Sequence, residues 1–144
     1  MSTYKFISRY IREPQSIGAL FPSTNALGMT IGHLVKSLDE SIALVELGPG
    51  TGSITKHLPD VTVSVEREVL FSDILKEKFK LRKIITADAI TYLSSIIEPV
   101  NIVSSIPLIN NPDSEKLKGI IKKLHQESLL KNIITYSYGS QSPL

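Results

Sequence analysis

A glycine-rich segment at residues 45–52 holds the residue types in this 144-residue chain best suited to binding a small polar ligand. It reads Val-Glu-Leu-Gly-Pro-Gly-Thr-Gly, with the acid Glu46 inside an apolar run just before the first glycine. Glycines let a backbone turn sharply and approach a ligand closely. A helix that begins behind them offers unpaired N–H groups to a polar ligand. The segment therefore predicts a nucleotide-cofactor loop around Gly48, Gly50 and Gly52.

The spacing of these glycines distinguishes between cofactors. The dinucleotide fingerprint is G-x-G-x-x-G, whose third glycine lets the helix pack beneath a pyrophosphate. Here the third glycine, Gly52, comes one position earlier, and Ser53 stands where the fingerprint needs glycine. The G-x-G-x-G pattern after an acidic strand end is similar to that of methyltransferases whose cofactor, S-adenosylmethionine, has no phosphate. We expect this cofactor.

Two further acids follow the next two predicted strands. The carboxylate of Glu66 has two oxygens and can accept hydrogen bonds from both hydroxyls of a ribose. Asp88 is placed to accept from an adenine amino group, with the Ala89 N–H nearby, because ligands bind at the carboxyl ends of parallel strands. The alternatives are a solvated strand-end charge paired with Arg67 for Glu66, and a helix N-cap for Asp88.

Strand-like and helix-like patterns alternate along the chain, which is typical of a doubly wound parallel α/β sheet. Strands are predicted at residues 42–47, 61–65, 83–86, 100–104 and 132–137. Helices are predicted at residues 3–12, 25–37, 52–58, 68–80, 89–97 and 113–128. The prediction is one domain over residues 1–144, with N-terminal helices and a cofactor-covering loop at 1–38 and a Rossmann-like core at 42–138.

The composition excludes several classes of site. Hydrophobic residues make up 42% and charged residues 21% of the chain, as in ordinary globular proteins. There is no cysteine, so disulfides and thiolate chemistry are excluded. The three histidines lack the i, i+4 pairing of a metal-binding helix, so no metal site is expected. Without a signal peptide or an apolar span of about 20 residues, we expect a cytoplasmic protein.

Six short segments, in order, resemble the bacterial phospholipid N-methyltransferases and the related ribosomal RNA adenine dimethyltransferases. The segments lie at residues 17–23, 45–52, 65–66, 87–89, 104–108 and 136–143. The glycine loop is shared by many methyltransferases. The Gly-Ala-x-x-Pro-Ser sequence near the start and the Tyr-Gly-x-x-Ser-Pro sequence near the end are much more selective. The resemblance implies methylation of phosphatidylethanolamine by an enzyme that lies peripherally on the inner membrane.

The resemblance also implies roles for individual residues. The methionyl part of the cofactor would be held by Glu46 and the three glycines, the ribose by Glu66, and the adenine end by Asp88 and Ala89. The methyl-transfer pocket would be lined by residues from the end of the fourth strand and from the N-terminal loop: Ser105, Ile106, Pro107, Leu108 and Ser23.

Proton removal from the acceptor amine needs a side chain or water near the site. Tyr138 and, less favourably, Tyr10 or Tyr136 are the candidates, and their aromatic faces suit a cationic product. For each tyrosine the alternative is ordinary packing with the hydroxyl at the surface.

The predicted basic helix at residues 3–12 either lies on an anionic membrane through Lys5, Arg9 and Arg12 or covers the cofactor pocket. The lysines of residues 113–131 are expected to form a solvated face, because no aromatics interleave them. We therefore expect a phospholipid surface as partner and no nucleic acid.

Two departures from the family leave alternatives open. Family members continue past the Ser-Pro motif into a further strand pair, whereas this sequence stops at Leu144. The fifth strand would then expose its edge. Either a homodimer covers this edge, or the chain is a truncated cofactor-binding protein without turnover. Residues 105–108 lack the Asn and the aromatic of the Asn-x-Pro-Tyr motif in the RNA-modifying relatives. Because that aromatic stacks on the target base, its absence weighs against nucleic-acid methylation. An RNA adenine N6-methyltransferase-like enzyme is therefore the disfavoured alternative.

Overall fold

A six-stranded sheet organises the chain in a computed structural model that describes residues 5–11, 24–106 and 112–138. All neighbouring strands are parallel. In their order across the sheet, the strands are β1 (Lys5–Ile11), β6 (Leu130–Tyr138), β5 (Val100–Ser104), β2 (Ala43–Leu47), β3 (Val63–Glu66) and β4 (Lys83–Thr86). The predicted parallel α/β fold is confirmed, and all five predicted strands form at or near the expected residues.

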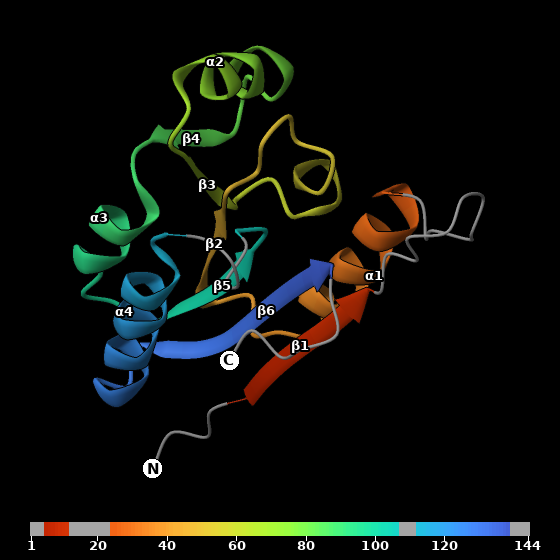
Figure 1. The fold of residues 1–144 in the computed structure, drawn as a ribbon. Helices are drawn as coiled ribbons and strands as arrows, with labels where there is room; N and C mark the ends of the chain where they lie inside the picture. The colour runs from red at the N-terminus through yellow and green to blue at the C-terminus, as the bar shows by residue number, and fades with distance from the viewer. Residues whose placement is uncertain (1–4, 12–23, 107–111, 139–144) are drawn as a thin grey trace.

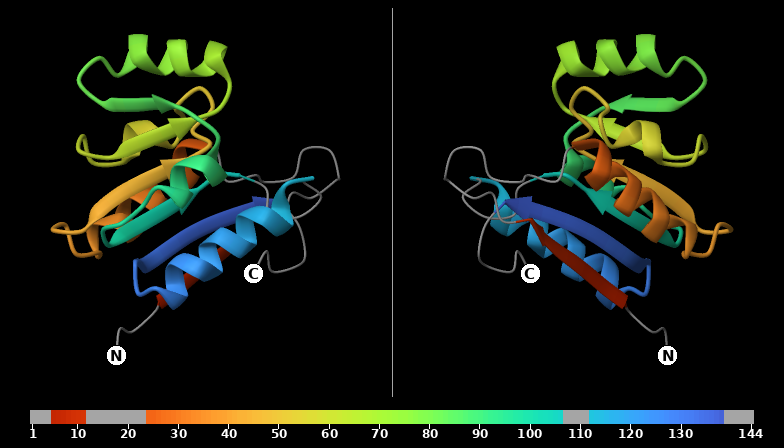
Figure 2. Two further views of the ribbon diagram at one scale, coloured as in Figure 1. Left: turned by 90° about the vertical axis from the view of Figure 1, so that its left-hand side faces the viewer. Right: turned by 90° about the vertical axis from the view of Figure 1, so that its right-hand side faces the viewer.

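Helices cover both faces of this sheet, as Figures 1 and 2 show. They are α1 (Thr24–Lys36), α2 (Val69–Lys78), α3 (Ala89–Ser94) and α4 (Ser114–Gln126). Helices α3 and α4 lie on one face and α1 on the other, so the sheet is doubly wound as predicted (Figure 1). Helix α2 packs on β3 and β4.

Two apolar cores result from this layering. The α4 side chains Leu117, Ile121 and Leu124 recur at i, i+4 and i+7 and are buried against the sheet face that carries Ile102 and Ile133. Burial of each such side chain contributes about 1.5–3 kcal/mol. The second core joins α1 to the opposite face. Its members are Leu27, Ile31, Val35, Leu44, Ile54, Leu58, Val103 and Ile134.

The prediction of a helix at residues 3–12 is wrong, because residues 5–11 form β1. It pairs in parallel with β6, from Lys5 opposite Asn132 to Ile11 opposite Tyr138. The cationic spacing fits a helix, but aromatic and β-branched residues also suit a strand, and pairing with a distant strand decides between the two. A basic helix lying on a membrane is therefore excluded for residues 5–11. The open edge of the fifth strand, which motivated the homodimer, is covered by β1 of the same chain.

The helix predicted at residues 52–58 is reduced to a single 3₁₀ turn, η1 (Thr55–His57). His57 packs against α1 where two glycines leave room for it. A Cβ added to Gly32 would stand 2.7 Å from the His57 carbonyl oxygen, and one added to Gly28 would overlap the imidazole ring. This close contact with α1 fixes the position of the turn, and the segment forms the turn and not the longer helix that was predicted.

None of the helices in the described part of the chain has the length and apolar character needed to cross a bilayer.

Candidate functional site

A cavity of about 280 Å³ opens at the carboxyl ends of the strands, beside the glycine loop. Because all the strands are parallel, the loop after β2 and the residues that end β3, β4 and β5 meet at this edge. The cavity lining comes from that loop, those strand ends and the starts of α2, α3 and α4. Its residues are Gly48, Gly50, Val65, Glu66, Arg67, Glu68, Phe71, Ala87, Asp88, Ala89, Ile90, Ser105, Ile106, Asp113 and Leu117.

The three glycines of the loop have distinct roles, although each has a positive φ that disfavours other residues. A Cβ added to Gly48 would stand 2.7 Å from Ile106, and one added to Gly52 would stand 2.6 Å from the ring of Phe79. These two glycines permit close packing within the protein. A Cβ on Gly50 would meet nothing within 4 Å. The space beside Gly50 is therefore open, and Gly50 lines the cavity.

The N–H groups of these glycines all donate within the protein. Gly48 N donates to the Val65 carbonyl oxygen at 3.0 Å and Gly52 N to that of Pro49 at 3.0 Å. Gly50 N donates to Oε2 of Glu66 at 2.9 Å. A phosphate-binding loop needs such N–H groups free to point at the anion. The geometry therefore disfavours a phosphate at these three glycines, in line with the glycine spacing.

Glu66 joins the loop to the end of β3. Its side chain is buried, and its second oxygen, Oε1, accepts from the Glu68 N–H at 3.0 Å. Each carboxylate oxygen has two lone pairs, so both can still accept from a ligand hydroxyl. Arg67 does not pair with Glu66 in the described structure; its guanidinium lies 3.7 Å from Glu68 and 3.9 Å from Asp113. This position fits the predicted ribose contact better than a solvated ion pair.

Asp88 follows β4 and caps α3. Its Oδ2 accepts from the backbone N–H groups of Ile90 at 3.0 Å and Thr91 at 3.2 Å. The N-cap alternative is therefore confirmed. Both bonds use the same oxygen, and Asp88 also lines the cavity beside Ala89. The other oxygen, Oδ1, takes no part in the cap, so Asp88 can cap α3 and also make the predicted contact with adenine.

Glu46 lies beneath the loop, fully buried, and is not part of the cavity lining. Its Oε1 accepts from Thr55 Oγ1 at 2.8 Å and from Ser64 Oγ at 2.7 Å. Burial raises the pKa of this carboxyl, against the lowering effect of the two hydroxyls and of the Arg82 charge. Among the described residues, no group donates to its Oε2. The role of Glu46 at the methionyl group stays a prediction.

Arg82 fixes the segment that follows the glycine loop. Its guanidinium donates to the carbonyl oxygens of Thr55 and Leu58 and to Asp60, and it lies 4.9 Å from the centre of the Phe79 ring. With Thr55 also bonded to Glu46, the turn is tied to β2 on one side and to the chain after α2 on the other. This support was not predicted, because the glycine motif gives no indication of its distant partners.

The charges around the cavity are mostly negative. Its lining includes four carboxylates, Glu66, Glu68, Asp88 and Asp113, and one guanidinium, Arg67. Opposite charges a few ångströms away stabilise a cation, and like charges oppose an anion. The site therefore suits a ligand that carries a positive charge and opposes a polyphosphate.

The residues predicted for the methyl-transfer pocket are described in part. Ser105 and Ile106 line the cavity, and the Ser105 N–H donates to the Leu47 carbonyl oxygen at 3.0 Å. Ser23, Pro107 and Leu108 lie outside the described residues.

The predicted catalytic tyrosines lie near the ends of the two outermost strands of one sheet edge. Tyr10 belongs to β1 and Tyr138 ends β6, where it pairs with Ile11. Their backbones, like that of Tyr136, thus approach the carboxyl edge of the sheet, as the glycine loop does. Their side chains lie outside the described part of the structure, so the catalytic role stays a prediction.

Phe71, Leu117 and Asp113 line the cavity without having been singled out in the sequence. Leu117 belongs to the buried face of α4, and Asp113 immediately precedes that helix. The sequence does carry a signal for Phe71, since it is an aromatic residue in the first turn of the helix that follows the strand-end acid Glu66.

Comparisons with known proteins identify the fold. The crystal structure of the 23S rRNA methyltransferase ErmE matches with a TM-score of 0.56 and 18% identity, over 88% of this chain and 48% of that one. A Thermoplasma acidophilum protein, 1320, matches with a TM-score of 0.47 and 10% identity, over 68% of this chain and 54% of that one. This chain thus spans about half the length of either protein. No family model and no curated protein matches the sequence. The chain has the Rossmann-like fold found in a solved methyltransferase.

Proposed function

We propose that this protein binds S-adenosylmethionine in the cavity beside the glycine loop and acts as a methyltransferase. The observation that carries the proposal is the hydrogen bond from Gly50 to Glu66 at the edge of the cavity. It places a carboxylate able to bind ribose hydroxyls beside the one glycine of the loop that leaves open space. The cofactor would supply an electrophilic methyl group on a sulfonium.

The residues present fit this cofactor and fit a phosphorylated nucleotide less well. The three glycine N–H groups are already bonded, and four carboxylates surround the cavity. S-adenosylmethionine carries a sulfonium and an ammonium against one carboxylate, so its net charge is complementary to that lining.

The chain's own residues would act mainly by positioning. Methyl transfer needs the acceptor nitrogen unprotonated and aligned with the methyl group, and alignment can supply much of the rate. Ser105 and Ile106 line the part of the cavity that follows β5, where the acceptor would enter. Tyr138 and Tyr10 remain the proposed groups for binding the acceptor and accepting its proton.

RNA is the first candidate acceptor. ErmE, the solved neighbour with a TM-score of 0.56, is a 23S rRNA methyltransferase, whereas no comparison supports a phospholipid acceptor. This reverses the order suggested by the sequence motifs. The absence of an aromatic at residues 105–108 argues against a base stacked there.

Phosphatidylethanolamine remains the second candidate because of the acidic cavity lining. A protonated ethanolamine is a cation, and the excess of carboxylates over the one guanidinium in the lining would attract it. RNA phosphates would be repelled by the same groups. The motifs at residues 18–23 and 138–143, which resemble the phospholipid N-methyltransferases, support the same acceptor.

One experiment distinguishes these acceptors. The purified protein is incubated with methyl-labelled S-adenosylmethionine, ribosomal RNA and phosphatidylethanolamine vesicles in one reaction, and the aqueous and organic phases are then separated. Label in the RNA supports the first candidate and label in the lipid the second; a Glu66→Ala variant should label neither. Cofactor binding without label in either phase would contradict the methyltransferase proposal and indicate a cofactor-binding protein without turnover.

A further inference from the structure

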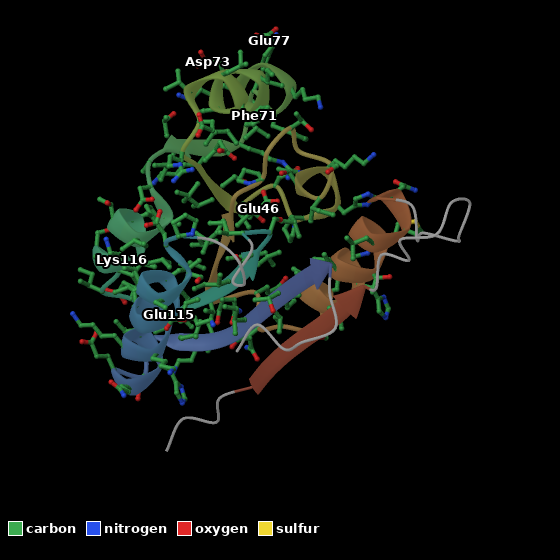
Figure 3. The ribbon with its side chains drawn as sticks, in the orientation of Figure 1. Glu46, Phe71, Asp73, Glu77, Glu115 and Lys116 are labelled. Carbon is green, nitrogen blue, oxygen red and sulfur yellow. The ribbon has the colours of Figure 1, made fainter. Side chains whose placement is uncertain are left out.

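Phe71 is an aromatic side chain that no motif accounts for, placed at the edge of the cavity. It lies in the first turn of α2, five residues after Glu66, and 36% of its surface is exposed. Figure 3 shows Phe71 on the side of α2 toward the sheet, with Asp73 and Glu77 on the outer side. Its two neighbours in the same turn, Val69 and Leu70, are more exposed and do not line the cavity.

The cavity needs an apolar face that its charged residues do not provide. Glu66 ends β3 and Asp88 follows β4, the two strands that α2 connects, and their carboxylates can bind only the polar edges of a nucleoside. A purine also has two flat faces, which are stabilised by contact with an aromatic ring. Phe71 is the aromatic residue in the described lining.

We propose that Phe71 packs against the adenine ring of the bound cofactor and forms one wall of the nucleoside site. The apolar lining of the cavity also includes Ile106, which follows β5, and Leu117 on α4. Glu66 then selects for ribose and Asp88 for the base edge, while Phe71 contributes affinity that does not depend on which purine is bound. This inference rests on the proposed nucleoside cofactor.

The whole sequence contains no tryptophan, which makes the test direct. Phe71→Trp and Leu70→Trp each introduce a single fluorophore, one inside the proposed wall and one in the same helical turn but outside the cavity. Addition of S-adenosylhomocysteine should quench the fluorescence of Phe71→Trp and leave that of Leu70→Trp unchanged.

Calorimetry with Phe71→Ala separates a ligand contact from a structural role. The variant should bind S-adenosylhomocysteine on the order of tenfold more weakly than the wild type. Free adenosine should lose affinity by the same factor, because the contact is with the nucleoside. Inosine, which lacks the amino group, should show the same loss between wild type and Phe71→Ala. A melting curve of the unliganded variant should show that it is fully folded at the temperature of the titration, so the lost affinity is not due to unfolding.

Three outcomes would overturn the inference. They are wild-type affinity in Phe71→Ala, an equal fluorescence response at positions 70 and 71, and a loss of affinity for S-adenosylhomocysteine without one for adenosine. In each of these the wild type still binds, so the proposed cofactor stands. Failure of the wild type itself to bind S-adenosylmethionine or S-adenosylhomocysteine would overturn the proposed function and the inference together.

Discussion

Glu46 and Glu66 end neighbouring strands of the sheet but have different surroundings. Glu66 accepts two backbone N–H groups and lines the cavity, whereas Glu46 accepts two hydroxyl groups and is completely buried. The first is placed to bind a ligand and to hold the glycine loop. The second ties that loop to the turn behind it through Thr55. Substitution of each glutamate by glutamine removes the charge at nearly constant shape and separates these roles.

Glu66→Gln should weaken binding of S-adenosylmethionine by roughly tenfold to a hundredfold, because hydrogen bonds to a charged group are worth about 1.5–3 kcal/mol. Titration calorimetry checks this. Glu77→Gln, on the outer side of α2 and largely exposed, is the matched control and should bind as the wild type does. Equal affinities for Glu66→Gln and Glu77→Gln would remove Glu66 from the site.

Glu46→Gln should change how stability depends on pH. Burial raises the pKa of Glu46 above its ordinary value, so the folded state holds the proton more tightly than the unfolded state. Wild-type stability from this group is therefore present at low pH and decreases as the pH rises through the folded pKa. Glutamine does not titrate. Unfolding in urea from about pH 4 to about pH 8 should show the variant gaining stability relative to the wild type as the pH rises. A pH-independent difference would contradict the raised pKa.

At the scale of elements, the sequence correctly predicted the strands and helices that depend on local residue pattern. Strands β4 and β5 form at the expected residues because their apolar runs are bounded by charged or turn-forming residues. The cavity edge was predictable for the same reason, since Gly50, Glu66 and Asp88 each follow a clear strand. Contacts between distant segments were not predictable. Residues 5–11 become a strand through β6, and residues 52–58 stay short through α1 and Arg82.

The packing of η1 on α1 gives a prediction at this scale. Gly28→Ala should destabilise the protein by on the order of 1–3 kcal/mol, because the new methyl group would overlap the His57 ring. Addition of His57→Ala to this variant should recover part of the loss. Chemical denaturation of the single and double variants measures both effects.

Gly119→Ala is the matched control in α4, a helix of the same 13-residue length as α1. A Cβ there would meet nothing within 4 Å, so alanine should stabilise by about 0.5–1 kcal/mol through backbone entropy and helix propensity. Destabilisation of the same size at both glycines would contradict the assigned contact with His57.

At the scale of the whole molecule, β1 closes one side of the sheet. It is the outermost strand next to β6, as the right-hand view of Figure 2 shows, and it comes from the opposite end of the sequence. The pairing satisfies backbone groups of β6 that would otherwise be open to another chain.

Removal of residues 1–11 should therefore expose β6 and promote self-association. Sedimentation velocity should show dimers or larger species at concentrations where the intact chain does not form them. Removal of residues 1–4 leaves β1 in place and is the control. A deletion of 1–11 that stays monomeric and equally stable would show that β1 contributes little to the sheet.

The same pairing sets an order of events during synthesis. Lys5–Ile11 leaves the ribosome before its partner Leu130–Tyr138, which is made almost a whole domain later. At about 5–20 residues per second, the first strand waits for several seconds while the remaining strands and helices emerge. Docking of β1 is thus a late step, and contacts of such long sequence separation form slowly. During that interval the nascent chain carries an unpaired strand rich in aromatic and β-branched residues, a segment of the kind that chaperones protect.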